Sequence, residues 1–210
     1  LVVLPQYPTS PLDGTPPQVF GLPRATLTRA VADSTAAPIE PISFPFDADG
    51  LRKQMTAYQG CEAIAFVQDR VYVVTEGGAD EGAGMQGKLI RGRVSAGKQN
   101  IQIRDLNGQS IPQQAEIPNM SYEALTTRGD TTIALFEANG ARVNDTARAY
   151  RFGPGLQPLS AVPFPTLEYR LTDATALDGD NRFWVINYFF PGDRDRLHPA
   201  PDTLAHRRPP

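Results

Sequence analysis

Several residue types that build common catalytic and metal sites are scarce in this chain of 210 residues. Cysteine occurs once, as Cys61, so the chain can form neither an internal disulfide nor a thiolate metal cluster. Histidine occurs only at His198 and His206, close to the C-terminal end. Because a Ser-His-Asp triad and a His-ligated metal site both need histidine beside their other members, the sequence disfavours both.

Long apolar runs and a strong charge of one sign are also missing. No run reaches the ~18 apolar residues needed to cross a bilayer, so we expect a protein that does not span a membrane. The net charge is -3 and the pI about 5.4, which gives no basic face and predicts no nucleic-acid partner. Cys61 opens an apolar run, and we expect it to be a small buried side chain.

From residue 61 onward the sequence consists of short runs rich in Val, Ile, Tyr, Phe and Thr, separated by Gly, Asp, Asn and Pro. No segment keeps a 3.6-residue apolar period over three turns, so we expect strands and little helix. The expected strands are EAIAFV, RVYVVTE, KLIRGRV and NIQIRDL in a first group, EALTT, TTIALFE, ARAYRFG and LQPLSAV in a second, DATAL and FWVINYFF in a third, and ATLTRAV and IEPISF before them.

One pattern occurs three times at the start of these groups. An acid followed by Ala opens an apolar run, an Asp falls seven residues later, and a carboxylate or its amide falls fourteen residues later. The copies are Glu62, Asp69 and Glu76; Glu123, Asp130 and Glu137; and Asp173, Asp180 and Asn187. The openings are 61 and 50 residues apart, which suits the blades of a β-propeller.

We therefore predict an all-β fold, a β-propeller of four-stranded antiparallel blades that forms an incomplete or partial ring in this chain. Residues 1–22 are expected to be a Pro-rich strap, residues 23–190 the blades, with repeats opening at 62, 123 and 173, and residues 191–210 a Pro-rich tail. The third blade stops after Phe190. Either the N-terminal strands complete it, or the chain is a fragment, or a second chain closes the ring; the fragment is the preferred explanation.

The spacing of the acids predicts their chemistry. If each hairpin turns at its Asp, the residues at positions zero and fourteen face each other, and Glu62 with Glu76, and Glu123 with Glu137, form close carboxylate pairs that need compensation. A two-residue turn would instead shift the pairing by one residue. The three Asp residues are predicted to be turn formers.

Two interpretations of the acids are open. Innermost propeller strands line the central channel, so the acids gather at one mouth as a ring of hard oxygen ligands, which favours Ca²⁺. Alternatively, the acids tie neighbouring blades together through backbone N–H groups or through Arg52, Arg170 and Arg182. Trp184 and the run Tyr188–Phe190 are expected in the core between blades.

The units GCEAIAFVQDRVYVVTE, YEALTTRGDTTIALFE and LTDATALDGDNRFWVINYFF resemble the E-G-[IL]-A … D-x-x-[LV]-[YW]-[VA] … E blades of the phytase-like β-propellers, a family named for an esterase-like activity of phytase. The resemblance covers roughly residues 55–195. It implies that Glu62, Glu123 and Asp173 hold a divalent cation, with Glu76 and Glu137 as neighbours.

The expected function is that of a Ca²⁺-assisted ester or phosphoester hydrolase, in which Glu76 or Glu137 acts as the base on a small-molecule substrate. The alternative is a non-catalytic propeller that binds a ligand or a protein partner at the same mouth. The chain begins with Leu1 rather than Met, which is compatible with removal of an export signal. The expected location is secreted or periplasmic.

Overall fold

The structure is a computed structural model that describes residues 1–8, 16–33, 35, 37–48, 50–55, 57–78, 85–95 and 100–201. Strands make up 47% of it and helices 11%, which confirms the all-β class. The elements in chain order are β1 (Val2–Val3), β2 (Gln18–Gly21), α1 (Arg24–Ala32), β3 (Ile42–Asp47), α2 (Leu51–Gln54), β4 (Tyr58–Val67), β5 (Arg70–Gly78), β6 (Met85–Ser95), β7 (Asn100–Ser110), β8 (Ala124–Arg128), β9 (Thr131–Leu135), β10 (Arg148–Phe152), β11 (Pro158–Pro163), β12 (Arg170–Ala174), β13 (Val185–Tyr188), the 3₁₀ turn η1 (Pro191–Asp193) and α3 (Arg194–Leu197).

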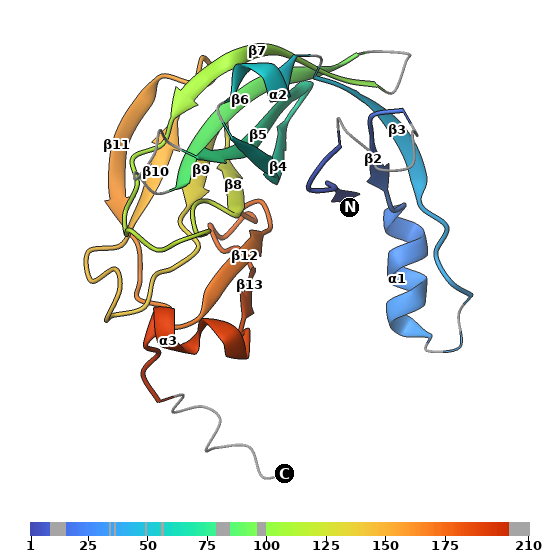
Figure 1. Cartoon of the computed structure of the whole chain (residues 1–210). Coiled ribbons are helices and arrows are strands. Elements are labelled where there is room, and N and C mark those ends of the chain that lie inside the picture. Colours follow the sequence, from blue (N-terminus) through green and yellow to red (C-terminus); the bar gives the residue numbers. More distant parts are fainter. Residues whose placement is uncertain are drawn as a thin grey trace.

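These elements form an arch (Figure 1). A seven-stranded sheet in the order β1-β2-β3-β7-β6-β5-β4 curves over its top. A four-stranded sheet in the order β11-β10-β9-β8 and the hairpin of β12 and β13 form one side. The other side consists of β2, β3 and α1 (Figure 1). The sheets therefore surround a concave inner face, on which the chain begins.

The two expected groups of four strands are confirmed. β4 to β7 run antiparallel in sequence order, and so do β8 to β11. β4 lies beside β8, and β8 beside β12, so the first strands of the three repeats are neighbours. This arrangement brings the ends of the three repeats together on the inner side of the arch.

The N-terminal region differs from expectation in one element. The run ATLTRAV, expected as a strand, belongs to helix α1. Ala, Leu and Arg are strong helix formers, and Pro23 occupies the N-cap position directly before the helix. No residue of α1 is buried. The alternation of apolar and polar residues in ATLTRAV therefore does not correspond to a buried face of a sheet. The run IEPISF does contribute to a strand, which begins at Ile42, after Pro41.

The third repeat is a two-stranded sheet in the described part of the chain. β1 to β3 join the first sheet instead, through the parallel pairing of β3 with β7, so the idea that N-terminal strands complete the third group is wrong. Of the expected tail, residues 191–197 form η1 and α3, and Leu197 is buried in the core. Residues 202–210 of that tail and residues 9–15 of the expected strap lie outside the described residues.

The expectation that Trp184 and the run Tyr188–Phe190 lie in a core is wrong. Trp184 is 81% exposed, and Tyr188, Phe189 and Phe190 are also exposed. Because β13 pairs only with β12 among the described strands, no further strand covers these side chains.

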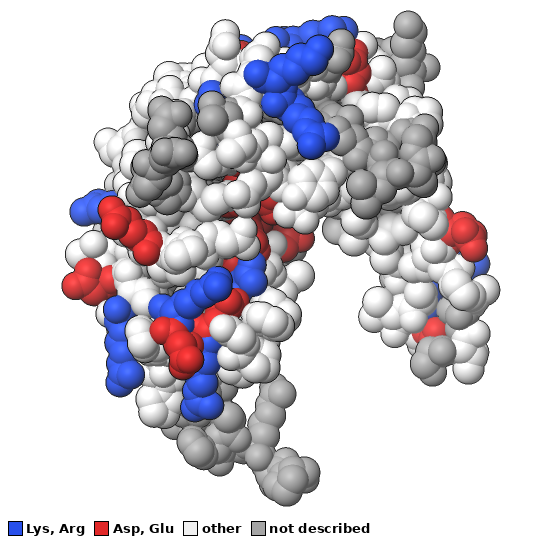
Figure 2. Space-filling model, in the orientation of Figure 1, with Lys and Arg blue, Asp and Glu red and all other residues white. Residues whose placement is uncertain are grey.

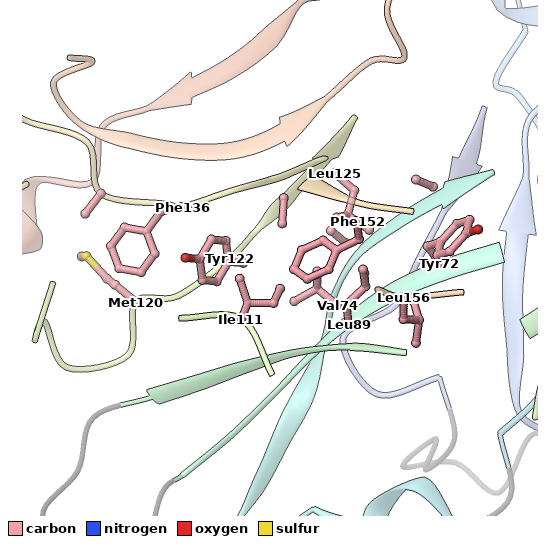
Figure 3. Close-up of a cluster of buried hydrophobic side chains, with 14 of the residues drawn as sticks. Tyr72, Val74, Leu89, Ile111, Met120, Tyr122, Leu125, Phe136, Phe152 and Leu156 are labelled. Atoms are coloured by element: carbon pink, nitrogen blue, oxygen red, sulfur yellow. The ribbon is translucent and has the colours of Figure 1, made fainter. Parts of the chain in front are cut away.

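The largest core lies between the first two sheets. Tyr72, Val74 and Leu89 of the first sheet lie in one cluster with Phe136 and Phe152 of the second repeat, and Figure 3 shows Val74 and Leu89 beside Phe152. Tyr122 lies in the same cluster, edge-on to Phe136 with ring centroids 5.2 Å apart. Cys61 is buried as expected, in a second cluster on the other face of the first sheet. The two sheets are thus held face to face by apolar contacts.

Gly92 of β6 has no room for a side chain. A Cβ at this position would lie 2.2 Å from the carbonyl oxygen of Gln102 on β7. We predict that Gly92→Ala lowers the free energy of unfolding by about 2 kcal/mol or more, because the backbone of β7 must shift. Urea denaturation measures this change. Gly179→Ala is the matched control, since nothing lies within 4 Å of its Cβ, and an equal loss in both variants would contradict the account.

Candidate functional site

Each repeat forms a hairpin with an irregularity beside its opening acid. The turn residues Gln68–Asp69 and Gly129–Asp130 lie between the pairs Val67–Arg70 and Arg128–Thr131, so the turns have two residues and the expected turn positions of Asp69 and Asp130 are confirmed. Asp180 lies in the turn of the third hairpin. A two-residue turn shifts the pairing by one, as anticipated.

The direct pairing of position zero with position fourteen is therefore wrong. In the first hairpin Cys61 pairs with Thr75 and Ala63 with Val74, which leaves Glu62 as an extra residue. Glu76 lies across from Gly60, and Asn187 lies across from Leu171. The acid and the residue before it thus face a single residue of the second strand, which is a β-bulge.

The second hairpin is regular over β8 and β9, and a hydrogen bond just beyond these strands shows the same offset. Ala124 pairs with Leu135, and the N–H of Glu137 donates to the carbonyl of Ser121 over 2.7 Å. If the pairing of β8 with β9 continued without a shift, Tyr122 rather than Ser121 would lie opposite Glu137. In all three repeats the residue at position fourteen therefore faces the residue two before the opening acid, so the repeated spacing encodes a bulge at one end of each hairpin.

The bulges bring the four glutamates of the first two repeats into one acidic cluster, which consists of Glu62, Glu76, Glu123 and Glu137. Glu137 is fully buried and Glu76 is 6% exposed. Their charges act on one another: Glu76 and Glu123 both raise the pKa of Glu62. Figure 2 shows acidic side chains recessed on the inner side of the arch, next to basic ones.

Arg170 at the start of β12 neutralises part of this cluster. Its Nε donates to Glu137 Oε1, and its Nη2 lies 2.9 Å from Glu123 Oε1. Its Nη1 lies 3.3 Å from Asp193 Oδ2, and its guanidinium lies over the ring of Tyr188. Burial alone would lower the pKa of Arg170, but Glu137 and Glu123 together raise it. Arg170 therefore joins the second repeat, β12 and η1.

The pKa values of the glutamates are all raised. Burial, with the charge of Glu76 and then that of Glu123, raises the pKa of Glu62 to about 8. Burial, with the charge of Glu123, raises the pKa of Glu76 to about 7. Burial is also the largest cause of the raised pKa values of Glu123 and Glu137. With four carboxyl groups against one guanidinium, the cluster holds protons near neutral pH or attracts a cation.

Three carboxylate oxygens of the cluster have no hydrogen-bond partner although they are buried: Glu62 Oε1, Glu76 Oε1 and Glu137 Oε2. Carboxylate oxygens are the ligands that Ca²⁺ prefers, so this donor set fits that ion. Within the described ranges, no three His, Cys, Asp or Glu side chains already converge closely enough to hold a metal. Binding of Ca²⁺ would therefore bring the side chains of Glu62 and Glu76, which have no ion pair with Arg170, towards those of Glu123 and Glu137, which Arg170 holds.

Asp173, the third expected ligand, is set apart from these four. It is exposed, and its Oδ1 accepts a hydrogen bond from the N–H of Ala174. Together with Glu62, Asp173 lines a groove of about 840 Å³. The groove runs along the inner strands β4, β8 and β12, and residues of β1 also line it. Ile64, Phe66 and Trp184 give this groove an apolar character. Asn187, at the equivalent of Glu76, donates to the carbonyl of Glu168.

The interpretation of the acids as ties between repeats is confirmed for Arg170, which bonds two of the repeated acids. Arg182 pairs with Asp178 and Asp180 in its own turn instead. Asp193, which also bonds Arg170, was missed because it lies in a segment expected to be an irregular tail. Leu197 lies four residues after Asp193, a spacing typical of one face of a helix, and this spacing could have indicated an ordered helical segment here.

Comparison with known proteins adds no identification: neither a protein-family model nor a curated protein matches this chain. In the described part of the chain, no helix has the length and apolar character needed to cross a membrane. The functional argument therefore rests on the geometry of the cluster.

The raised pKa values give the metal-free protein a defined pH dependence. Between the ordinary value near 4.5 and the folded values near 7 and 8, Glu76 and Glu62 keep protons that the unfolded chain releases. This contribution to stability is complete below about pH 4.5 and is lost as the pH rises through 7 and 8. We predict that the melting temperature, measured with a chelator present, falls by about 5 °C or more from pH 6 to pH 9.

The matched variants are Glu62→Gln and Glu116→Gln, the second being an exposed glutamate outside the cluster. Glu62→Gln should raise the melting temperature at pH 9 and flatten the pH profile, because the neutral amide cannot ionise. Glu116→Gln should leave both unchanged. A flat wild-type profile, or a lower melting temperature of Glu62→Gln at pH 9, would contradict the assignment.

Proposed function

We propose that this protein binds a Ca²⁺ ion in its acidic cluster and hydrolyses an ester or phosphoester beside it. The observation that carries the proposal is the set of buried carboxylate oxygens of Glu62, Glu76 and Glu137 that have no hydrogen-bond partner. Ionising these buried carboxyl groups is costly, because a single guanidinium can offset only one of the four negative charges that full ionisation of the cluster creates. A divalent cation removes most of that cost.

The proposal includes a propeller-type fold. It is supported by the two antiparallel four-stranded groups, by the adjacency of β4, β8 and β12, and by the hairpin that opens each of the three repeats. The resemblance of these repeats to the blades of phytase-like propellers agrees with this arrangement. In such a fold the inner strands surround a channel, and the concave groove beside β4, β8 and β12 takes that place.

In this proposal Glu62 and Glu123 hold the ion, and Glu76 and Glu137 lie beside it. A bound Ca²⁺ supplies Lewis-acid polarisation of an ester or phosphoryl oxygen. Beside a bound cation, which favours its ionised form, Glu76 can accept a proton from a water and return it to the leaving group. Arg170 fixes the carboxyl groups of Glu123 and Glu137. The groove lined by Glu62 accommodates the body of the substrate.

A second candidate function is supported by a different observation. Trp184, directly before β13, and Ile186 and Tyr188 within it occupy alternate positions and are all exposed. Since alternate residues of a strand point to one face, they form an apolar stripe on an open edge strand, and aromatic side chains are enriched in protein interfaces. In this alternative the protein is a non-catalytic binding module, and the acidic cluster only ties its repeats together.

Calorimetric titration of metal-stripped protein with Ca²⁺ tests the cation site. We predict saturable binding in the micromolar range that is lost in Glu123→Gln, because this variant removes a ligand charge while keeping the side-chain shape. Glu116→Gln, outside the cluster, should bind as the wild type does. If no heat is released and Ca²⁺ does not raise the melting temperature, the cluster is an internal tie and the cation proposal is wrong.

Hydrolysis of p-nitrophenyl acetate and p-nitrophenyl phosphate, with Ca²⁺ or with a chelator, separates the two candidate functions. We predict turnover that disappears with the chelator and falls by about 100-fold or more in Glu76→Gln, because the proton acceptor is removed. In the same variant the melting temperature at pH 7 should not fall. Calcium binding without turnover of either substrate would contradict the proposed hydrolysis and favour a non-catalytic protein that uses the ion for structure.

A further inference from the structure

A second charged site lies at the other end of the first hairpin. Arg70 of β5, Arg91 and Arg93 of β6 and Arg104 of β7 line one pocket of about 220 Å³. Gly92 and Asp105 complete its lining. Along β5, Arg70 precedes Glu76 by six residues, or roughly 20 Å at ~3.3 Å per residue, so this arginine pocket is separate from the acidic cluster.

Strand register brings these arginines together. Arg70 lies directly across from Arg93, and two residues along, on the same face, Tyr72 lies across from Arg91. Like charges in direct opposition destabilise a sheet. Arg104 falls at a bulge, because Ile103 pairs with Gly92 while Asp105 pairs with Arg91, and a bulge redirects the side chain it carries. The local fold thus concentrates positive charge at this pocket.

The aspartates around the pocket offset these charges only in part. Arg70 pairs with Asp130 over 2.9 Å, and Arg91 with Asp105 over 3.5 Å and with the carbonyl of Pro154 over 2.8 Å. The two outer arginines are more exposed, although the Arg93–Asp69 pair is short, at 2.7 Å. Arg93 is 71% exposed and uses one nitrogen on Asp69, and Arg104 is 68% exposed with Asp47 at 3.8 Å, beyond hydrogen-bond distance.

Exposed ion pairs of this kind contribute little in water, so an incoming anion can compete for both guanidinium groups. Each guanidinium has five donors in a planar arrangement that matches the oxygens of a phosphate group. The pocket volume equals that of about seven water molecules at ~30 Å³ each, which suits a phosphate or pyrophosphate group rather than a larger organic ligand.

We propose that the arginine pocket is an anion-binding site for a phosphate group, present either as a free anion or as a small phosphomonoester. Arg70 and Arg91 are the fixed inner donors, held by Asp130 and Asp105. Arg93 and Arg104 are the outer donors that close on the ligand. This site does not depend on Ca²⁺ binding at the acidic cluster.

Calorimetric titration of the full chain with pyrophosphate, inorganic phosphate and glycerol phosphate, at low ionic strength and with a chelator present, tests the proposal. We expect saturable pyrophosphate binding that is weakened at least about tenfold in Arg93→Gln and in Arg104→Gln. If inorganic phosphate and glycerol phosphate bind with comparable affinities, the site accepts phosphomonoesters as well as free phosphate. If only the inorganic anions bind, the site is specific for free phosphate.

The control variants separate a binding site from a surface ion-pair network. Arg182→Gln removes an equally exposed arginine elsewhere and should bind as the wild type does. Glu62→Gln should also leave pyrophosphate binding unchanged, which keeps this test independent of the proposed calcium site. Asp69→Asn should bind as tightly as the wild type or more tightly, because it frees the guanidinium of Arg93.

Two results would overturn the proposal. The first is the absence of saturable binding of any of the three anions to the wild type. The second is a loss in Asp69→Asn or Arg182→Gln as large as that in Arg93→Gln, since affinity would then follow general charge or ion-pair disruption rather than the donors of this pocket. Melting temperatures of the four surface variants (Arg93→Gln, Arg104→Gln, Asp69→Asn and Arg182→Gln) establish that each is folded.

Discussion

The ion pairs of Arg170 are the interaction on which the candidate site depends. One guanidinium at the start of β12 bonds Glu123, Glu137 and Asp193, so a single side chain links the second repeat, the third repeat and the helical turn η1. Loss of one partner of such a buried group leaves uncompensated charge that costs about 3–5 kcal/mol. Arg170 therefore fixes two carboxyl groups in place but cannot neutralise the two that remain, Glu62 and Glu76.

The bulges explain why the acids gather at all. In a regular hairpin with a two-residue turn, the residue at position fourteen would lie opposite the residue directly before the opening acid. The extra residue beside each acid bends the strand and increases its twist, which turns the ends of the first two hairpins towards one another and towards Arg170. The opposite end of the first hairpin carries the turn and the arginine pocket. One antiparallel pair, β4 and β5, thus runs from the acidic cluster at one end to the arginine pocket at the other.

The sequence alone predicted the strands of the first two repeats because alternating Val, Ile and Tyr between Gly and Asp is a local signal, as in RVYVVTE. It also predicted the turn positions of Asp69 and Asp130. It did not predict helix α1, where the alternation in ATLTRAV reflects no buried face. Nor did it predict the register beside Glu62 and Glu123, because the repeated spacing fixes the number of residues between the acids but not which of them lies unpaired. The role of Asp193 depends on a contact between segments 23 residues apart, which local patterns do not specify.

The central claim is that the glutamates beside Arg170 form a cation site, and locating a bound ion tests it most directly. Crystals grown with Tb³⁺, which takes the place of Ca²⁺ among carboxylate oxygens, give anomalous diffraction that places the ion without prior assumption. The account predicts one strong peak within coordination distance of carboxylate oxygens of Glu62 and Glu123. A protein whose crystals show no such peak, or show Tb³⁺ bound only at surface aspartates away from Arg170, would contradict it.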